Sequence, residues 1–536
     1  MSMITALGWV ARGKAAQFPT KYILDDDELG RISELAKLQL EDAQEDLDEA
    51  RAKEEKDSEG EEDSEKKGSG VANIQSHGDV DNDLKEYDLE HYDDDEEQEE
   101  HSEGAPMGMF AGIKSLAYHQ AGEEDPYITL KEDEEDDEER EELQILAEDN
   151  LILAARIEDE IAHLEVYVYE DSADNLYVHH DIMLPAIPLA VEWLDFGVGK
   201  SSDADTSSNF VAVGTMDPDI EIWDLDIVDC MYPNAILGQG AETASETDKL
   251  KKKKKKKKSK KANDEFHVDS VLSLAANRQH RNLLASSSAD CTIKLWDLST
   301  LKCAKSYSYH TDKVCSVAWN PAETTALLSG SYDRTVVAAD MRAPNAKAPR
   351  WGVESDVEAV RWNPHDPNFF FVSTEAGIIH YHDVRNAPSS PAKTKPIWTL
   401  QAHDEAVSSF DVNQVIPGFL VTGSTDKEVK LWNVQASGPS MVVSRNLGVG
   451  KVFSTTFAPD AEVGFRLAVA GSKGDVQIWD TSTNAAVRRI FADRVAPAKG
   501  EVTERLIGIE NDDSESDSGE ELEDGQSADE DDEMEE

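Results

Sequence analysis

The sequence repeats a set of polar residues at fixed intervals, and this repetition constrains the fold more than any other feature. An interval of 29 residues recurs three times, from His267 to Trp296, from His310 to Ala339 and from His403 to Trp432. An aspartate precedes the end of each interval by six residues, at Asp290, Asp333 and Asp426. A serine precedes it by eight, at Ser288, Ser331 and Ser424. Such periodicity indicates a chain built from stacked copies of one unit.

Each copy predicts four short β-strands. Stretches such as Val271–Leu274 favour a strand, and a tight polar turn separates residues 286–288 from the strand that ends at Trp296. Degenerate copies of the unit end at Trp223, His382 and Trp479. Together with the three regular copies they give six units after Pro185.

Three further strands precede these units, at residues 151–155, 164–169 and 176–180. They predict a seventh unit that lacks one strand. Two segments are candidates for the missing strand, 505–509 near the C-terminus and 113–118 upstream. The expected fold is an all-β, seven-bladed propeller whose two ends join, because ring closure leaves no exposed sheet edge.

The repeated units resemble WD repeats, in which a strand ends in Trp-Asp, as at Trp296-Asp297. The resemblance implies a hydrogen-bonded relay inside each blade. In this relay an aspartate at the turn fixes the histidine, and the serine hydroxyl bridges the histidine to the indole N–H. A buried polar network specifies geometry when every member is satisfied. The expected relay residues are His267, Ser288, Asp290, Trp296, His310, Ser331, Asp333, His403, Ser424, Asp426 and Trp432.

Charge is concentrated outside the repeats. The chain carries 52 Lys+Arg and 112 Asp+Glu, a formal net charge of -60. The acidic stretches contain few large apolar residues, so they cannot bury enough surface to offset the entropy of ordering. We therefore expect a mostly disordered acidic linker at 25–149, a WD-repeat propeller at 150–510 and a disordered acidic tail at 511–536.

The four cysteines are isolated from one another and flanked by apolar residues. This pattern indicates buried thiols in a reducing compartment rather than a disulfide or zinc framework. Neither a signal peptide nor an apolar run of about 18 residues, the length that spans a bilayer, is present. The sequence therefore predicts a soluble intracellular protein without a membrane partner.

Sequence blocks outside the repeats resemble the periodic tryptophan protein 1 family. The blocks are residues 3–13, 125–131, 177–182 with 191–194, and 220–229 followed by a lysine run. The resemblance covers nearly the whole chain. It implies a non-enzymatic nucleolar scaffold in ribosome biogenesis that takes part in rRNA processing. It also implies proteins of the large-subunit precursor and pre-rRNA as partners.

The first 24 residues interleave aromatic and basic side chains, unlike the acidic linker after them. Such a mixture suits insertion into an RNA groove or a protein pocket, whereas a frayed terminus is the alternative. We expect a docking arm that is tethered to the propeller but is not part of its core, with Trp9 as its anchor. The candidate docking residues are Trp9, Arg12, Lys14, Phe18, Lys21 and Tyr22.

A lysine-rich segment at 241–264 interrupts the propeller. Charges of one sign at this density repel one another, so the run must loop out of the sheet. It predicts a nuclear or nucleolar import signal and a contact with phosphate backbones, and a solvated loop is the alternative. The residues are Lys251, Lys252, Lys253, Lys254, Lys255, Lys256, Lys257 and Lys258.

The acidic tracts, such as 132–139, either hold histones and other basic proteins by charge or only solubilise the chain. Four serines have an acid three residues later, as acidophilic kinases prefer, and phosphate there would add negative charge. These candidate phosphosites are Ser58, Ser514, Ser518 and Ser527.

No pattern predicts a catalytic residue, a cofactor site, a metal site or a small-molecule substrate. The cluster His179-His180-Asp181 is a weak metal candidate, because alternation along a strand sends adjacent side chains to opposite faces. Two rival functions remain. One is a chromatin adaptor that binds histones during transcription of ribosomal DNA, and the other is an enzyme with an unrecognised site.

Overall fold

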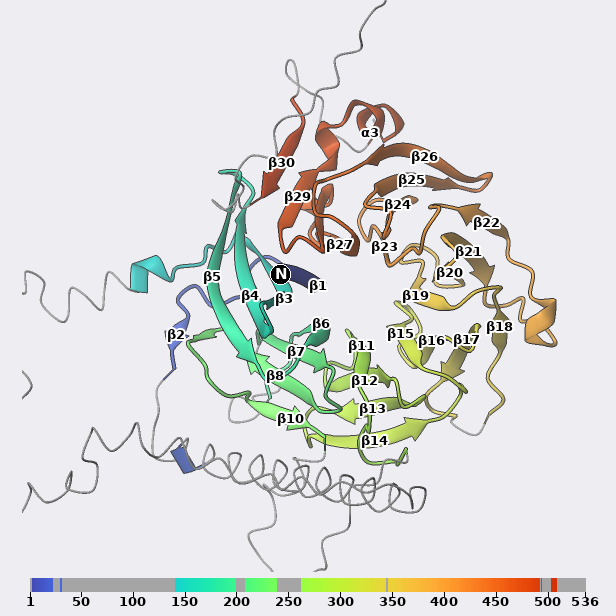
Figure 1. Ribbon diagram of the computed structural model, residues 1–536, viewed down its shortest axis with the longest axis horizontal. Helices are drawn as coiled ribbons and strands as arrows, with labels where there is room; N and C mark the ends of the chain where they lie inside the picture. Colours follow the sequence, from blue (N-terminus) through green and yellow to red (C-terminus); the bar gives the residue numbers. More distant parts are fainter. Residues whose placement is uncertain are drawn as a thin grey trace, which may run out of the picture. The chain divides into compact units, whose positions relative to one another are not determined.

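The computed structural model describes residues 2–22, 29–30, 140–198, 208–238, 262–343, 346–491, 493 and 503–508. These residues form seven four-stranded antiparallel sheets around a central axis (Figure 1). The sheets are the blades of a β-propeller, which confirms the predicted fold class. No helix in these ranges is long and apolar enough to cross a membrane.

The strands of each blade are named here from the axis outward (Figure 1). Blade 1 contains β1 (Ser2–Val10), β3 (Asn150–Glu158), β4 (Ile161–Glu170) and β5 (Asn175–Leu184). Blade 2 contains β6 (Pro188–Leu194), β7 (Phe210–Thr215), β8 (Ile220–Asp224) and β10 (Ala235–Leu237). Blade 3 contains β11 (Val271–Ala276), β12 (Leu283–Ser288), β13 (Ile293–Asp297) and β14 (Lys302–Tyr307). Blade 4 contains β15 (Val314–Trp319), β16 (Ala326–Ser331), β17 (Thr335–Asp340) and β18 (Arg350–Gly352).

The remaining blades follow the same plan. Blade 5 contains β19 (Val357–Trp362), β20 (Phe369–Thr374), β21 (Ile378–Asp383) and β22 (Trp398–Gln401). Blade 6 contains β23 (Ser409–Val412), β24 (Phe419–Gly423), β25 (Val429–Gln435) and β26 (Gly438–Arg445). Blade 7 contains β27 (Val452–Phe457), β28 (Arg466–Gly471), β29 (Val476–Asp480) and β30 (Arg505–Gly508). Helices whose bounds lie within the described residues are η6 (Pro391–Lys393), η7 (Ala461–Val463), η8 (Thr481–Thr483) and α3 (Ala485–Ile490).

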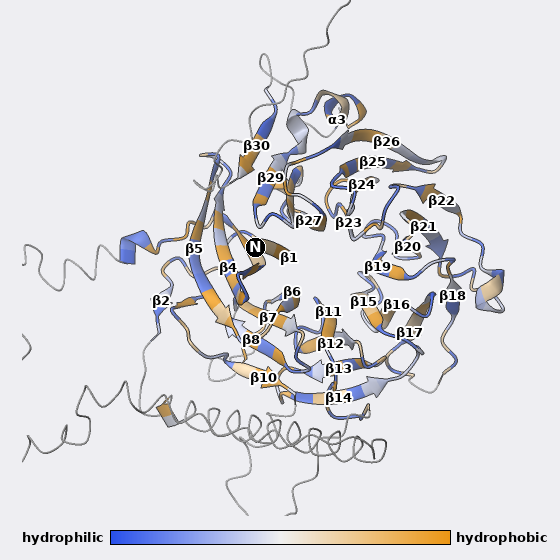
Figure 2. Ribbon diagram, in the orientation of Figure 1, coloured by the Kyte–Doolittle hydropathy of each residue, from blue (hydrophilic) through white to orange (hydrophobic). Residues whose placement is uncertain are grey.

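Apolar side chains of the strands pack between neighbouring blades. Figure 2 shows that hydrophobic residues occur along many of these strands. Strands β7 and β8 are buried along their whole length, as expected for strands covered on both faces. The cluster between blades 7 and 1 includes Ile4, Leu7 and Trp9 of β1. The first strand of the chain is therefore part of the propeller core.

Both ends of the chain close the ring. β1 pairs with β3 and is the innermost strand of blade 1, whereas β30 pairs with β29 as the outer strand of blade 7. Of the two candidates for the missing strand of the first blade, 505–509 is therefore ruled out, and 113–118 lies outside the described residues. The separation of an arm at 1–24 from a propeller at 150–510 is also wrong, because residues 2–10 are a core strand.

The chain continues from β1 across blade 2. Strand β2 (Thr20–Lys21) pairs in parallel with β9 (Ile227–Val228). The backbone N–H of Ala16 donates to Asp226 Oδ1 over 2.9 Å. Residues 2–22 thus contact blades 7, 1 and 2, and we call them the N-terminal clasp.

Candidate functional site

Three blades contain a buried hydrogen-bonded relay. In blade 3, His267 Nδ1 lies 3.0 Å from Asp290 Oδ2, and His267 Nε2 lies 2.7 Å from Ser286 Oγ. The indole N–H of Trp296 donates to the same hydroxyl over 2.8 Å. If His267 is neutral with its proton on Nδ1, each member donates to the next, from indole to hydroxyl to imidazole to carboxylate.

Blade 6 repeats this geometry. His403 contacts Asp426 Oδ2 and Thr422 Oγ1, each over 2.8 Å, and the Trp432 indole donates to the threonine hydroxyl over 2.9 Å. Blade 4 keeps the histidine, the hydroxyl and the aspartate, but Ala339 replaces the tryptophan. There His310 Nδ1 lies 3.1 Å from Asp333 Oδ2, and His310 Nε2 lies 2.9 Å from Ser329 Oγ.

The bridging hydroxyl differs from the predicted one in every relay. The prediction chose Ser288, Ser331 and Ser424, whereas the bridge is two residues earlier, at Ser286, Ser329 and Thr422. The predicted serines order the turn instead: Ser288 Oγ accepts the N–H of Asp290 over 3.1 Å and donates to the Asp269 carbonyl over 2.9 Å. Residues two apart share a strand face, but only the earlier hydroxyl reaches the indole. The predicted aspartate–histidine contacts are confirmed.

Burial lowers the pKa of His267 and of His403, which keeps both imidazoles neutral. Burial by itself would raise the pKa of Asp290, but hydrogen bonds with His267 and Thr292 outweigh it and bring this pKa to about 2. Hydrogen bonds likewise outweigh burial at Asp333 and lower its pKa. The polar atoms of the histidines are used within the blades, as expected of structural rather than catalytic groups.

Replacing Asp426 by alanine is expected to lower the free energy of unfolding by about 1–3 kcal/mol, because the buried His403 loses the acceptor of its N–H. Urea unfolding at neutral pH measures this change. Asp404→Ala is the matched control, since Asp404 is an exposed acid next to His403 in the chain. An equal loss of stability in both variants would contradict the relay.

Acid should act on stability in two stages. The folded-state pKa of His382 is about 3, because burial lowers it from 6.5, so its contribution is present above pH 6.5 and declines on acidification. Burial raises the pKa of Glu221 and of Glu358 to about 7 from 4.5, so their contributions grow as the pH falls from 7 to 4.5. Burial also lowers the pKa values of His180, His267 and His403, which act in the same direction as His382. The contributions of these histidines and of the two glutamates therefore largely offset each other above pH 4.5.

Below pH 4 the signs agree. The pKa of Asp290 falls from 3.8 to about 2 on folding, so its contribution, about 2 kcal/mol, is present above 3.8 and lost as the pH falls through 2. We expect the urea midpoint to change little between pH 7 and 5 and to fall steeply between pH 4 and 2. A midpoint that stays constant below pH 4 would contradict this assignment.

Trp9, the predicted anchor of a free arm, is 8% exposed. Its indole N–H donates to the Thr456 carbonyl in blade 7 over 3.1 Å. Its ring meets the Tyr169 ring edge-on, with 6.0 Å between centroids. The prediction that Trp9 lies outside the propeller core is wrong, because the apolar side chains of β1 fill the space between blades 7 and 1.

The other predicted docking residues also lie on the propeller. Each of four has a partner there: Arg12 with Asn150, Lys14 with Asp195, Phe18 with Arg140, and Tyr22 with the core between blades 1 and 2. Lys21 lies in β2 and is exposed. The aromatic and basic residues of this segment therefore serve contacts within the chain.

A second pattern of hydrogen bonds joins the inner strands of successive blades. An indole N–H donates to a carbonyl of the preceding blade over 2.9 to 3.1 Å: Trp319 to Ala275, Trp362 to Ala318, and Trp9 to Thr456. Two residues earlier, a backbone N–H donates to a serine hydroxyl: Val317 to Ser273, Val360 to Ser316, and Leu7 to Ser454. We call this pair of bonds the inner-strand latch.

The latch supplies the sequence signal that locates β1. The pattern aliphatic, any residue, small, aliphatic, any residue, tryptophan occurs at 4–9, 314–319 and 357–362. In all three strands the register shifts between the first and third residue of this pattern, as a β-bulge requires. Aligning the opening residues with the internal repeats would therefore have identified the missing strand.

Charged residues form a second seam between blades 7 and 1, farther from the axis. Arg466 Nε donates to Asp171 Oδ1 over 2.7 Å, and its Nη1 lies 2.5 Å from Asp480 Oδ1. Arg505 of β30 donates to the Asp171 carbonyl over 2.5 Å and pairs with Asp174. Backbone, apolar and ionic contacts thus all join the two ends of the ring.

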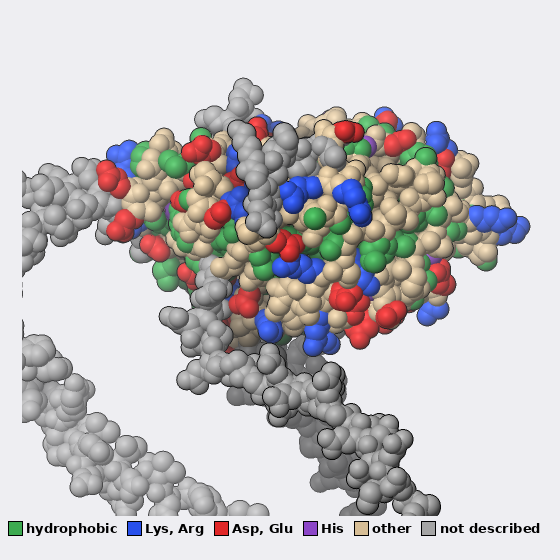
Figure 3. All heavy atoms as spheres, turned by 90° about the horizontal axis from the view of Figure 1, so that it is seen from above, with side chains coloured by type: hydrophobic (Ala, Val, Ile, Leu, Met, Phe, Trp, Pro, Cys, Tyr) green, Lys and Arg blue, Asp and Glu red, His purple; other side chains and the backbone are tan. Residues whose placement is uncertain are grey.

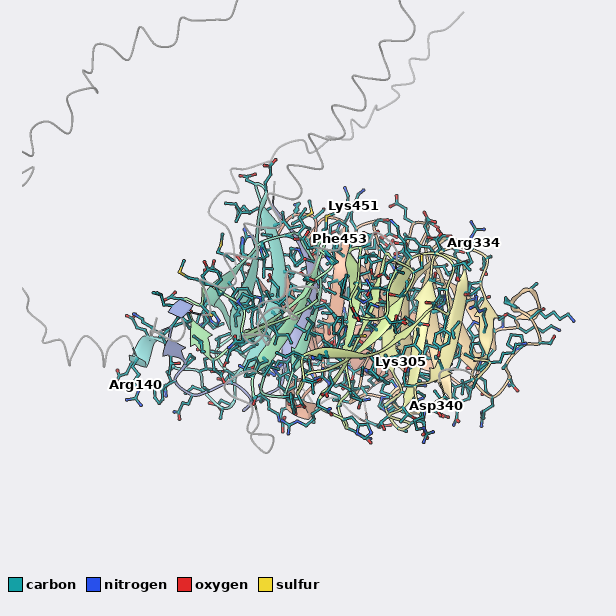
Figure 4. The ribbon with its side chains drawn as sticks, turned by 90° about the horizontal axis from the view of Figure 1, so that it is seen from below. Arg140, Lys305, Arg334, Asp340, Lys451 and Phe453 are labelled. Atoms are coloured by element: carbon teal, nitrogen blue, oxygen red, sulfur yellow. The ribbon has the colours of Figure 1, made fainter. Side chains whose placement is uncertain are left out.

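The face of the ring that carries the relay turns is the candidate docking surface. Arg334 follows a relay aspartate, and Figure 4 places Arg334, Lys451 and Phe453 at this face and Asp340 at the opposite one. Over the edge of the ring shown in Figure 3, acidic and basic side chains are interspersed.

Acidic side chains gather on this face at blades 4 and 5. Arg334 Nε lies 3.1 Å from Asp356 Oδ1. Burial, and then the charges of Glu375 and Asp356, raise the pKa of Glu358 to about 7. Asp356 and Glu375 leave this part of the face acidic, with Glu358 only partly ionised at pH 7, which suits a basic partner.

The two histidines of the weak metal candidate lie closer together than strand alternation predicts. A β-bulge at His179 interrupts the pairing of β4 with β5, and His179 Nδ1 lies 2.8 Å from His180 Nδ1. No group of three or more His, Cys, Asp or Glu side chains that could hold a metal occurs among the residues that the structure describes.

Three sets of predicted residues lie outside the described ranges. They are the lysines Lys251 to Lys258, the serines Ser58, Ser514, Ser518 and Ser527, and the acidic tracts at 132–139 and 511–536. Their roles stay predictions.

Comparison with known proteins agrees with the fold. The family model "WD domain, G-beta repeat" matches residues 261–297, 301–337 and 394–433. These ranges include most of blades 3, 4 and 6, which contain the three relays.

Three relatives are similar to this chain over nearly its whole length. It is 51% identical to an uncharacterized WD repeat-containing protein of Schizosaccharomyces pombe over 95% of each chain. It is 38% identical to periodic tryptophan protein 1 of Saccharomyces cerevisiae, over 91% of this chain and 90% of that one. It is 30% identical to the Drosophila melanogaster homolog, over 92% of this chain and 96% of that one. With relatives this similar over nearly their whole length, and with the expected propeller, the chain belongs to the periodic tryptophan protein 1 family.

Proposed function

We propose that the protein is a non-enzymatic nucleolar scaffold in ribosome biogenesis, which binds large-subunit precursors and takes part in rRNA processing. Membership of the periodic tryptophan protein 1 family carries this proposal, since the family resemblance implies that role. A rigid ring with loops on two faces suits binding of proteins and RNA.

The acidic part of the relay face supports a basic protein as one partner. Ribosomal proteins and histones are both basic, so the surface chemistry fits the proposed role and its chromatin rival. Opposite charges across an interface speed association and favour one orientation. Candidate partners on the particle are therefore its basic proteins, with pre-rRNA bound beside them.

Crosslinking in cells tests the proposal. RNA bound to the tagged protein should map to the precursor of the large subunit, and the co-purified proteins should be large-subunit assembly components. Binding to nucleosomes that resists salt and ribonuclease would favour the chromatin adaptor instead. Crosslinks spread evenly over unrelated RNAs would contradict both.

Deleting Lys249 to Lys261 is expected to reduce nuclear accumulation, because the run fits an import signal. Fluorescence of a tagged protein in cells measures the ratio of nuclear to cytoplasmic signal. Replacing the same lysines by serine and glycine preserves segment length and serves as a second variant. An unchanged ratio with both variants would exclude the run as the main import signal.

The serines Ser58, Ser514, Ser518 and Ser527 are proposed phosphosites in this role. Added phosphate would strengthen attraction to basic partners through charge.

A further inference from the structure

We propose that the space between blades 7 and 2 beside β3 is a strand-binding site that also accepts its ligand in trans. The ligand is the N-terminal clasp of a second copy of this chain. In one chain the site is filled by its own clasp, residues 2–22. The proposal stands apart from the proposed function, since it rests on contacts within the propeller.

Three kinds of contact define the site. The edge of β3 supplies a backbone ladder for β1 from Ser2↔Glu158 to Val10↔Leu151. Blade 7 supplies an apolar wall of buried side chains, Ala468, Ala470, Val476 and Ile478. Blade 2 supplies the Pro188 carbonyl, which accepts the Thr5 hydroxyl over 2.7 Å. Main-chain pairing gives such a site affinity, and the side-chain pockets give it selectivity.

The latch makes the site selective for one pattern. It requires an N–H at position 7 to reach Ser454 and an indole at position 9 to reach Thr456. The third position of the pattern, next to the bulge, is small in all three latch strands, at Ala6, Ser316 and Ala359. Few extended peptides meet all of these conditions, whereas every copy of the clasp does.

The clasp is also the inner-strand segment with the longest tether. Residues 308–313 connect β15 to the preceding strand β14, and residues 238–270 connect β11 to β10, but residues 11–149 separate β1 from β3. Effective concentration falls as roughly the three-halves power of loop length, so that of β1 is about a hundredfold lower than that of β15 and about tenfold lower than that of β11. Exchange between two molecules is therefore easier for the clasp than for any other inner strand, because the resident clasp has the lowest effective concentration at its own site.

The test uses the full chain with a specific protease site, flanked by Gly/Ser spacers, inserted between Ala36 and Lys37. After the protein has folded, cleavage cuts the covalent link between the clasp and the propeller. The clasp is then held only by its noncovalent contacts with blades 7, 1 and 2. A fluorescent peptide of residues 2–22 is then added in excess. Fluorescence anisotropy and gel filtration measure its uptake, and denaturing gels verify cleavage.

We expect the peptide to replace the resident clasp in the cleaved protein, and to enter the uncleaved protein much more slowly. A Trp9→Ala peptide should bind at least about thirtyfold more weakly, because the anchor and its latch are lost. A Gln17→Ala peptide should bind like the wild type, since that side chain is exposed.

Three outcomes would overturn the proposal. The Trp9→Ala peptide binding as well as the wild type would exclude a selective site. A resident clasp that stays bound for days with no uptake would show that the strand does not exchange. If the cleaved protein loses its clasp and then aggregates, no strand-accepting site remains. The same holds if it loses the clasp, keeps its melting temperature and takes up no peptide.

Discussion

Trp9→Ala should lower the free energy of unfolding by about 3–5 kcal/mol, the usual cost of removing a large buried aromatic side chain. The indole is 8% exposed and packs between blades 7 and 1, so its loss leaves a cavity in the seam that closes the ring. The melting temperature of the purified protein should fall by several degrees. Calorimetry or urea unfolding measures the change.

Trp9→Phe is the matched control. Phenylalanine keeps an aromatic ring against Tyr169 but removes the N–H that Thr456 accepts, so the expected loss is smaller. Gln17→Ala, on an exposed side chain nearby, should change stability little. If Trp9→Ala unfolds at the same temperature as the wild type but loses binding to pre-ribosomal particles, Trp9 is a docking anchor after all.

Arg466→Met is expected to destabilise the propeller by about 1–3 kcal/mol, because Asp480 and Asp171 lose their nearest cation and its hydrogen bonds. Arg505 remains 3.8 Å from Asp480 and 3.9 Å from Asp171, so it compensates their charge only in part. The Arg466 and Asp480 side chains are 11% and 6% exposed. An uncompensated buried carboxylate is costly, whereas an exposed ion pair contributes little. Urea unfolding at neutral pH measures the loss.

The double variant Arg466→Met with Asp480→Asn measures the interaction energy between these two side chains, apart from their contacts with other groups. If the two groups stabilise each other, the double variant loses less than the sum of the single variants. Arg342→Met is the control, since Arg342 pairs with Asp340 on an exposed surface. Additive losses, or equal losses in Arg466→Met and Arg342→Met, would contradict a buried ionic seam.

The sequence was sufficient to predict the blades and most of each relay. His267 and Asp290 were located correctly because both lie at turns, where spacing is fixed by the repeat. The bridging hydroxyl was misplaced because β12 ends in three buried serines, Ser286 to Ser288. Only the register, which sets Leu284 opposite Trp296, determines which hydroxyl the indole reaches.

The first strand was missed for a different reason. β1 is separated from β3 by residues 11–149, and short-range strand signals do not link segments so far apart. Its aromatic and basic residues also fit a docking segment by composition alone. The pattern shared by 4–9, 314–319 and 357–362 held the missing information, because it reflects contacts between blades rather than within one.

The position of β1 has a consequence for synthesis. This strand leaves the ribosome before the other strands of the propeller, but its neighbours in blade 7 follow only from residue 452 on, and the outer strand of that blade ends at Gly508. At roughly 5–20 residues per second, the ring stays open for about half a minute to nearly two minutes of translation. During that interval the apolar side chains of β1 lack their final partners, so this strand is prone to aggregation until blade 7 has been made.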